Sequence, residues 1–292
     1  MKERVAAVPY AATWERAPSR RASDVTTVRT RSAYLRSGLA ATTATAAVVV
    51  GVLGSGGASG QGPTATPAVD RCAQPGPYAL PRGSEPVVLD PEDFTTRIDH
   101  PYWPMRPGTV WHLVETADGE TQRVTVTVTH RTRMIAGIEA RVVHDIVRSH
   151  GEIVEDTLDW YAQDSGGNLW YLGEATEEYE KGEVVSTEGS WEHGRDGAYA
   201  GVLLPARPRV GCAYREEFRP GEAEDRALVL ARREAAEVPA GYYRRLLQTS
   251  NTTPLEPRLL ENKFYARGVG PVLEVDLSPS FSRGVLVRVE HR

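Results

Sequence analysis

The chain has 292 residues, of which 40% are hydrophobic and 25% are charged, as is usual for a soluble globular protein. This composition excludes a wholly disordered chain and a polytopic membrane protein. Residues 1–36 hold eight basic and three acidic residues, whereas residues 70–292 hold 26 basic and 36 acidic residues, a net charge of −10. Residues 70–292 are therefore acidic and would repel nucleic acids and anionic lipid headgroups, so we expect no nucleic-acid partner.

Residues 1–59 have the order of an export signal. A basic start is followed by an uncharged apolar stretch and then by small residues at Gly56, Ala58 and Gly60, where a signal peptidase could cut. An uncleaved signal anchor at residues 38–54 is the alternative, and it would be the protein's only contact with a membrane. In both cases the positive-inside rule predicts a secreted or extracytoplasmic protein.

Residues 60–97 form a second region, which is crowded with proline and predicts an extended linker or strap. From Ile98 the sequence becomes aromatic, with Tyr102 and Trp103 between prolines, so we expect this part to pack on the domain that follows. The third region, residues 98–292, is the predicted exported β-rich domain.

From residue 109 onward, apolar and polar residues alternate with the period of a half-buried strand. Turn signals at Asp118-Gly119, His150-Gly151, Asp164–Gly167 and Lys181-Gly182 separate the runs. The predicted strands cover residues 109–115, 122–129, 139–148, 153–163, 168–172, 184–191, 213–219, 226–237, 242–249, 259–266, 269–277 and 285–290. About a dozen mostly antiparallel strands without helices predict a single all-β domain, built as a curved sheet, a half-barrel or a sandwich.

Several sequence segments resemble those of an uncharacterised family of exported prokaryotic proteins, over roughly residues 98–277. They are Asp159–Asp164 with Gly167–Tyr171, then Ser186–Trp191, Gly221–Asp225 and Lys263–Val272. More distantly, Tyr102–Trp111, the Val238–Gly241 turn and the Tyr-Ala-x-Gly-Val-Gly phrase at 265–270 are similar to envelope lipoproteins with a curved antiparallel sheet. The resemblance implies that fold and no particular activity. The sequence lacks the acylated cysteine of the lipoproteins, because Cys72 follows Asp70 and Arg71.

Familiar catalytic signatures are absent. The sequence has no Gly-x-Ser-x-Gly elbow, no His-Glu-x-x-His, no Walker loop, no dinucleotide fingerprint and no Cys-x-x-Cys pair. We therefore favour a noncatalytic protein and name no catalytic residue.

The segment from Gly151 to Glu192 carries twelve carboxylates and one lysine. Such a density predicts a solvated acidic face, or a Ca²⁺ site that gathers oxygens from adjacent strands and turns. The candidate metal ligands are Asp156, Asp159, Asp164, Glu174 and Glu188. No other cofactor is expected.

Aromatic residues lie in the same segment. Trp160, Trp170 and Trp191 are the candidate ligand-binding residues, since aromatic side chains on a concave sheet bind sugars or lipids; the alternative is that they belong to the core.

Two cysteines, Cys72 and Cys212, predict one disulfide, because both reach an oxidising compartment after export. The alternative is two unrelated thiols.

Three hypotheses for function follow. The first is a noncatalytic envelope or extracellular binding module for an apolar or glycan ligand. The second is a hydrolase with paired carboxylates, and the third is a structural or interaction protein with a cation-stabilised acidic face.

Overall fold

The computed structural model describes residues 70–292, so the predicted signal peptide, the signal anchor at 38–54 and residues 60–69 of the strap lie outside it. The described residues are almost entirely β-structure. Within them, no helix is long and apolar enough to cross a membrane. The elements are η1 (Pro91–Asp93), β1 (Phe94–Thr95), β2 (Thr109–Ala117), β3 (Glu120–Ile135), β4 (Ile138–Ser149), β5 (Glu152–Asp164), β6 (Leu169–Glu180), β7 (Glu183–Ser186), β8 (Trp191–Glu192), β9 (Tyr199–Leu204), β10 (Ala213–Arg215), β11 (Glu217–Phe218), β12 (Arg226–Val238), β13 (Gly241–Thr252), β14 (Leu260–Ala266), β15 (Gly270–Ser278) and β16 (Ser282–His291).

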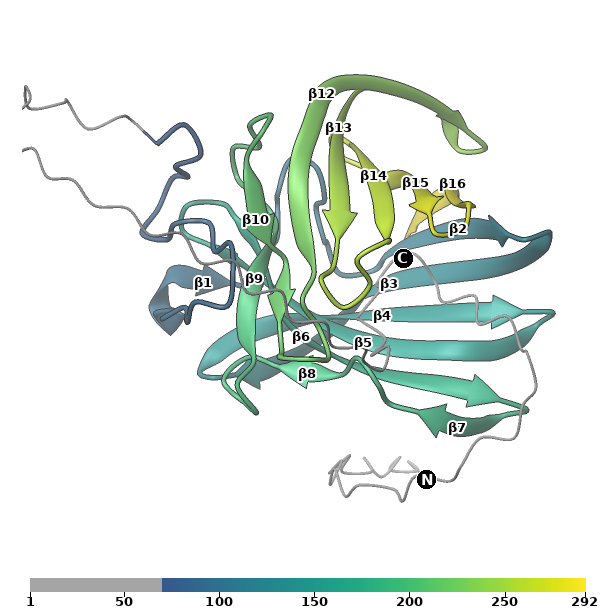
Figure 1. Ribbon diagram of the computed structural model, residues 1–292, viewed down its shortest axis with the longest axis horizontal. Helices are drawn as coiled ribbons and strands as arrows, with labels where there is room; N and C mark the ends of the chain where they lie inside the picture. Colours follow the sequence, from purple (N-terminus) through teal and green to yellow (C-terminus); the bar gives the residue numbers. More distant parts are fainter. Residues whose placement is uncertain (1–69) are drawn as a thin grey trace, which may run out of the picture. The chain divides into compact units, whose positions relative to one another are not determined.

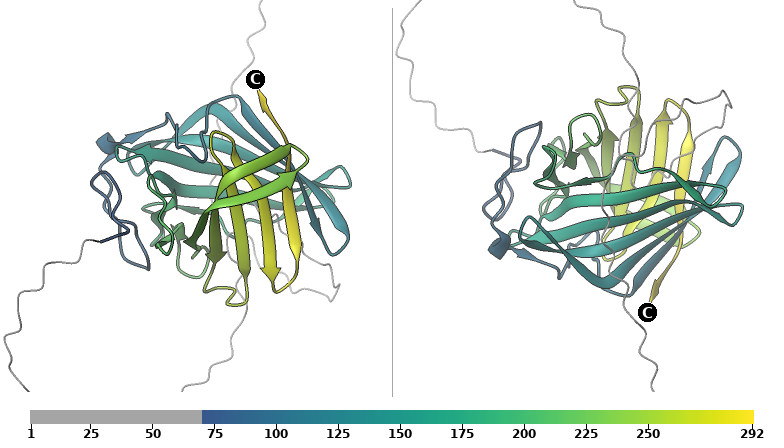
Figure 2. Two further views of the ribbon diagram at one scale, coloured as in Figure 1. Left: turned by 90° about the horizontal axis from the view of Figure 1, so that it is seen from above. Right: turned by 90° about the horizontal axis from the view of Figure 1, so that it is seen from below.

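All sixteen strands belong to one antiparallel sheet. Thirteen of them follow the order β10-β12-β13-β14-β15-β16-β2-β3-β4-β5-β6-β9-β11, while β1 pairs with β5, and β7 and β8 pair with β6. The predicted all-β fold with a curved antiparallel sheet is therefore confirmed. Figure 1 shows β2–β6 and β12–β16 as two parts of this sheet that run across each other, and Figure 2 shows the two parts from opposite sides.

The turn residues determine where the long hairpins reverse direction. The first turn residue is Asp118 between β2 and β3 and His150 between β4 and β5, with φ of 50° and 52°. Gly119 and Gly151 follow with φ of 84° and 93°. Two consecutive residues with positive φ give the tight turn whose twist matches that of the flanking strands. These turns lie where the sequence predicted them.

One short segment brings the two ends of the sheet together. β10 pairs with β12, while β11, only one residue further along the chain, pairs with β9. Gly201 on β9 makes this crossing feasible, because a Cβ there would collide with the backbone of Arg215 and Glu216. The curved sheet thus nearly closes on itself.

The core lies inside this curve. Along β2 the inward side chains of Trp111, Leu113 and Glu115 are buried, whereas His112 and Val114 between them are partly exposed. This alternation is the one expected for a sheet with one face on the core.

The hairpin of β12 and β13 bends over β14–β16 (Figure 2). Register shifts between Val229 and Ala235 mark bulges that bend β12. At its turn Val238 is buried, and the N–H of Ala240 donates to the carbonyl of Leu286 at 3.1 Å.

The aromatic segment that follows the Pro-rich strap packs on the sheet, as predicted: Ile98, Tyr102 and Trp103 are all buried. Further upstream the guanidinium of Arg215, 1% exposed, donates to the strap carbonyls of Gly83 and Glu85 at 2.6 and 2.8 Å. Charge-assisted bonds of this kind are stronger than neutral ones. They fix the strap against the segment that closes the sheet.

The predicted disulfide between Cys72 and Cys212 is present, with Cα atoms 5.6 Å apart and a sequence separation of 140 residues. It joins the start of the described strap to the residue that precedes β10.

Candidate functional site

A pocket of about 340 Å³ lies where four segments distant in sequence meet. The segments are the strap near Pro101, the loop between β9 and β10, the strand β12 and the turn between β14 and β15. Four arginines line it: Arg207, Arg209, Arg232 and Arg267. No acidic residue contributes to the lining, so the pocket is strongly positive within an acidic domain.

The four arginines have no acidic partners. Within residues 70–292, none of them forms an ion pair, and all four side chains are exposed. Some other arginines of the domain are paired: Arg133 and Arg195 both contact Glu192, at 2.5 and 2.6 Å.

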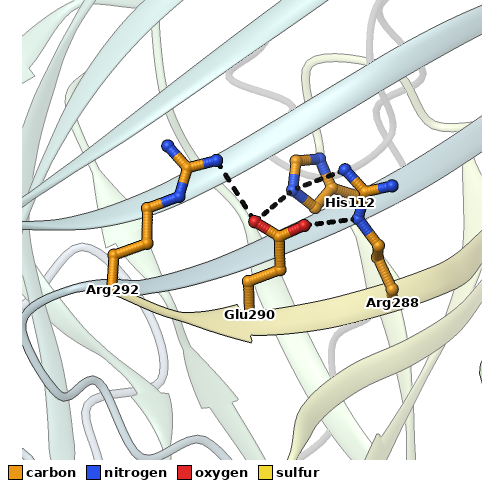
Figure 3. Close-up of polar contacts among 4 residues, drawn as sticks. All are labelled: His112, Arg288, Glu290 and Arg292. Atoms are coloured by element: carbon orange, nitrogen blue, oxygen red, sulfur yellow. Dashed lines mark hydrogen bonds and ion pairs between the residues drawn. The ribbon is translucent and has the colours of Figure 1, made fainter.

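The outer face of β16 gives a second example of paired arginines (Figure 3). Arg288 and Arg292 donate to the two carboxylate oxygens of Glu290 at 2.7 and 3.1 Å, and His112 lies 3.6 Å from the same carboxylate. The hydrogen bond from Arg292 and the charge of Arg288 hold the pKa of Glu290 below its ordinary value. This cluster joins the last residues of the sequence to β2, and we assign it a structural role.

A buried histidine links two of the segments that line the pocket. His100 is fully buried; its Nδ1 accepts the N–H of Tyr102 at 3.2 Å, so its Nε2 carries the proton and donates to the carbonyl of Pro205 at 3.1 Å. Burial, together with the smaller effect of the Arg267 charge, lowers the pKa of His100 to about 4, which favours the neutral form. A neutral His100 therefore joins the strap to the loop that carries Arg207.

The arginine loop is held on both sides by other side chains. The side-chain amide of Gln74 accepts a hydrogen bond from the backbone N–H of Arg207 at 2.8 Å and donates one to the backbone carbonyl of Arg207 at 3.3 Å. Asn168 accepts the N–H of Ala206 at 2.9 Å, and the N–H of Cys212 donates to the carbonyl of Arg209 at 3.0 Å. The loop is thus ordered without a ligand, which reduces the entropy cost of binding.

Arg267 has its own support. Its guanidinium carbon lies 5.2 Å from the centre of the Tyr102 ring, within the range of a cation–π interaction. The Tyr102 ring is 4% exposed, so Arg267 and its neighbours cover it. The pocket offers charged donors and the apolar walls of Pro101, Ala206 and Pro208, and its lining has no carboxylate or imidazole for proton transfer. Its chemistry is that of binding an anion.

No family model matches the chain, and no curated protein matches it. A solved structure does. It is that of a "putative lipoprotein" from Parabacteroides distasonis ATCC 8503, with 11% sequence identity and a TM-score of 0.38. The match covers 65% of this chain and 99% of that chain. The match assigns no activity.

The candidate metal ligands lie in different places. Asp159 and Glu174 face each other across β5 and β6 on the inner side, whereas Asp156 points to the outer side and contacts His144 at 2.7 Å. Glu188 lies between β7 and β8, and its N–H donates to Ser186. Within residues 70–292, no group of three acidic, histidine or cysteine side chains is arranged to hold a metal ion. The Ca²⁺ site remains a prediction.

Asp164, the fifth candidate, organises the turn between β5 and β6. Its carboxylate accepts the N–H and the side-chain amide of Asn168 and the indole N–H of Trp170, all at 2.8 Å. These three donors satisfy the buried carboxylate of Asp164 without a cation.

We expect Asp164→Ala to destabilise the protein by about 3 kcal/mol, because it leaves these buried donors without an acceptor. Urea denaturation in the presence of EDTA measures this, since a loss that persists without metal belongs to the hydrogen bonds. Ser165→Ala, in the same turn but exposed, is the control and should change the midpoint little. An Asp164→Ala protein that is destabilised only when Ca²⁺ is present would contradict this interpretation.

The three candidate tryptophans are buried in the core, each with 3% or less of its surface exposed. Trp160 packs under the guanidinium of Arg133, 4.2 Å from the ring centre, and the indole of Trp191 donates to Glu217 at 2.7 Å. Their role in ligand binding remains a prediction, and their observed contacts are structural.

The interior holds carboxylates where the sequence predicted an acidic face in solvent. Asp145 on β4, Asp159 on β5 and Glu174 on β6 are all 2% exposed or less. The hydroxyl of Tyr171 donates to Asp159 at 2.7 Å, while neither carboxylate oxygen of Asp145 has a hydrogen-bond partner within the described residues. Burial raises the pKa of all three, that of Asp159 to about 7.

A second buried acidic group lies where the sheet closes. Burial raises the pKa of Glu216 to about 7, against the opposing effects of Lys263 and of the Asn251 amide, which donates to Glu216 at 2.5 Å. Burial, followed by the charge of a neighbouring carboxylate, raises the pKa of Glu217 and Asp225 as well. Burial therefore favours the protonated form of these carboxyl groups.

The arginine pocket was not predicted from the sequence, because its residues come from four separate segments. The one local signal is the sequence Arg207-Pro208-Arg209, in which an arginine lies on each side of a proline within an acidic domain.

Proposed function

We propose that the protein is a noncatalytic extracytoplasmic binding module whose arginine pocket binds a negatively charged group of its ligand. The observation that carries this proposal is the convergence of four arginines, without acidic partners, on one pocket. Like charges repel, so this arrangement is unfavourable until an anion joins it. Guanidinium groups also match carboxylate and phosphate oxygens with paired hydrogen bonds.

An extracytoplasmic location is supported by the disulfide between Cys72 and Cys212, since disulfides persist in oxidising compartments. The order of charges in residues 1–59, which predicted export, agrees with it. Whether residues 38–54 are cleaved or retained is outside the described residues.

Of the two ligand classes expected from the sequence, the pocket favours a glycan over an apolar molecule. Half of its lining residues are charged, and a purely apolar ligand would leave those charges without partners. A sugar that carries an anionic group would satisfy the arginines while its ring lies against Pro101 and Pro208. The hydrolase hypothesis would depend on the Asp159 and Glu174 pair, and the burial of both side chains does not favour it.

Calorimetric titration with glucuronate, inorganic phosphate and glucose tests the proposal. We expect saturable binding of the two anions and none of glucose. The double variant Arg207→Gln, Arg267→Gln should weaken anion binding about tenfold or more, since charge-assisted hydrogen bonds are lost. Arg123→Gln, an exposed arginine on β3, is the matched control.

Glucose that binds as tightly as glucuronate, or a double variant that binds anions as the parent does, would contradict the proposal. Recovery of the sugar ligands unchanged after incubation checks the noncatalytic part of it.

A further inference from the structure

We infer that the ligand of the arginine pocket is a linear anionic glycan, a chain with repeated negative charges, rather than an isolated small anion. This inference rests on the proposed function and extends it to the surface beside the pocket. There the positive charge continues from Arg209 along its loop to Arg71 of the strap.

The contact that places Arg71 is at Gly211, two residues after Arg209. The guanidinium of Arg71 lies 3.0 Å from the position that a Cβ on residue 211 would take. Gly211 has a φ of +81°, which also favours glycine. Glycine at this position therefore lets Arg71 lie against the arginine loop.

Arg71 is held in place by its neighbour. Cys72 forms the disulfide with Cys212, which directly follows Gly211, so both ends of the contact are covalently linked. The nearest carboxylate in sequence, Asp70, accepts the N–H of Cys72 at 2.9 Å. Within the described residues Arg71 itself forms no ion pair, and its side chain is exposed.

We call Arg71 and the four pocket arginines the basic track. Arg71 is not among the residues that line the pocket, and it lies beside the loop that carries Arg209. A polymer with regularly spaced charges can contact both the pocket and Arg71 and gains from each added contact by releasing counterions. The unpaired Arg71 is therefore better explained by an extended ligand than by a small one.

A glycan fits better than a nucleic acid. Proteins that bind single strands stack bases on exposed aromatic rings, and the aromatic ring of this pocket, Tyr102, is 4% exposed beneath Arg267.

The test uses oligogalacturonates, linear glycans with one carboxylate per sugar, from the monomer to the dodecamer. With the parent protein we expect affinity to rise about tenfold from monomer to hexamer, and the hexamer to show the steeper loss of affinity with added salt. In Arg71→Gln the hexamer should bind no more tightly than the monomer. The double variant Arg207→Gln, Arg267→Gln should lose affinity for every length, and Arg123→Gln should match the parent.

Affinity that does not depend on length, or a length effect that persists in Arg71→Gln, would overturn this inference while leaving anion binding by the pocket intact. Failure of every anion to bind would instead overturn the proposed function. An oligonucleotide of equal charge that binds more tightly than the hexamer would overturn the choice of a glycan. A thiol assay on Arg71→Gln confirms that the disulfide still forms.

Discussion

The folded protein is expected to be more stable at pH 5 than at pH 8. Asp159 and Glu216 have pKa values of about 7 when folded, against ordinary values near 4, because both are buried. Between about pH 4 and pH 7 the folded state keeps protons that the unfolded chain releases, so the free energy of unfolding falls as the pH rises. Each such group contributes on the order of a few kcal/mol over this range.

Two histidines, His100 and His193, act in the opposite direction, because burial lowers their pKa values. His100 is neutral when folded, with a pKa of about 4, and its unfolded value is 6.5. Its contribution to the free energy of unfolding is lost as the pH falls from 6.5 toward 4. This loss offsets the stability gained from about one carboxylate. The raised pKa values of Asp145, Glu174, Glu217 and Asp225 add to those of Asp159 and Glu216, so the carboxylates prevail.

Guanidinium chloride denaturation at pH 5 and pH 8, at matched ionic strength, measures this difference. Asp145→Asn should raise the midpoint at pH 8 and weaken the dependence on pH, because it removes a carboxyl group that burial holds in its protonated form and whose oxygens have no hydrogen-bond partner within the described residues. Asp118→Asn, in an exposed turn, should leave the dependence unchanged. Equal stability at the two pH values would show that these interior carboxylates titrate normally.

Removal of the disulfide is expected to have the second large effect. The bond closes a loop with a sequence separation of 140 residues, and the chain-entropy model gives about 5 kcal/mol for a loop of this length. The variant Cys72→Ser, Cys212→Ser should therefore unfold at a clearly lower denaturant concentration than the oxidised parent.

Treatment of the parent with a reductant should reproduce the midpoint of the double variant, and the same reductant should leave that variant unchanged. Coincident denaturation curves for the oxidised and reduced parent would mean that the bond contributes nothing to stability. The reduced protein should also lose the preference for long oligogalacturonates, since Arg71 would no longer be fixed beside the arginine loop.

Much of the sheet could be predicted because it depends on local chemistry. Alternating valines in β3, and aspartate or histidine before glycine in the turns, specify hairpins from a few adjacent residues. The strand β9 was missed because the run from Ala200 to Leu204 is apolar throughout, so it has no period of two. The predicted strand at 213–219 is divided between β10 and β11, because it pairs with two different neighbours.

The site was harder to predict because it is nonlocal. Arg207, Arg232 and Arg267 meet only when β9, β12 and the turn after β14 are in place. The acidic residues gave a stronger local signal, but alternation along a strand does not reveal which face is the core. Asp159 and Glu174 therefore lie inside the sheet, and Asp156 outside it.

The position of β16 has a consequence for how the chain folds. This strand comes last in the sequence yet lies between β15 and β2, where Thr109 and His291 contact each other across 182 residues. While the chain is being made, β2 and β15 each have an open edge that only β16 can fill, and open edges invite pairing with other chains. Closure over such a distance in sequence is slow. Deleting the final ten residues would therefore divide the sheet through its middle, and a chain that crosses a membrane unfolded would complete its sheet only after these residues had emerged.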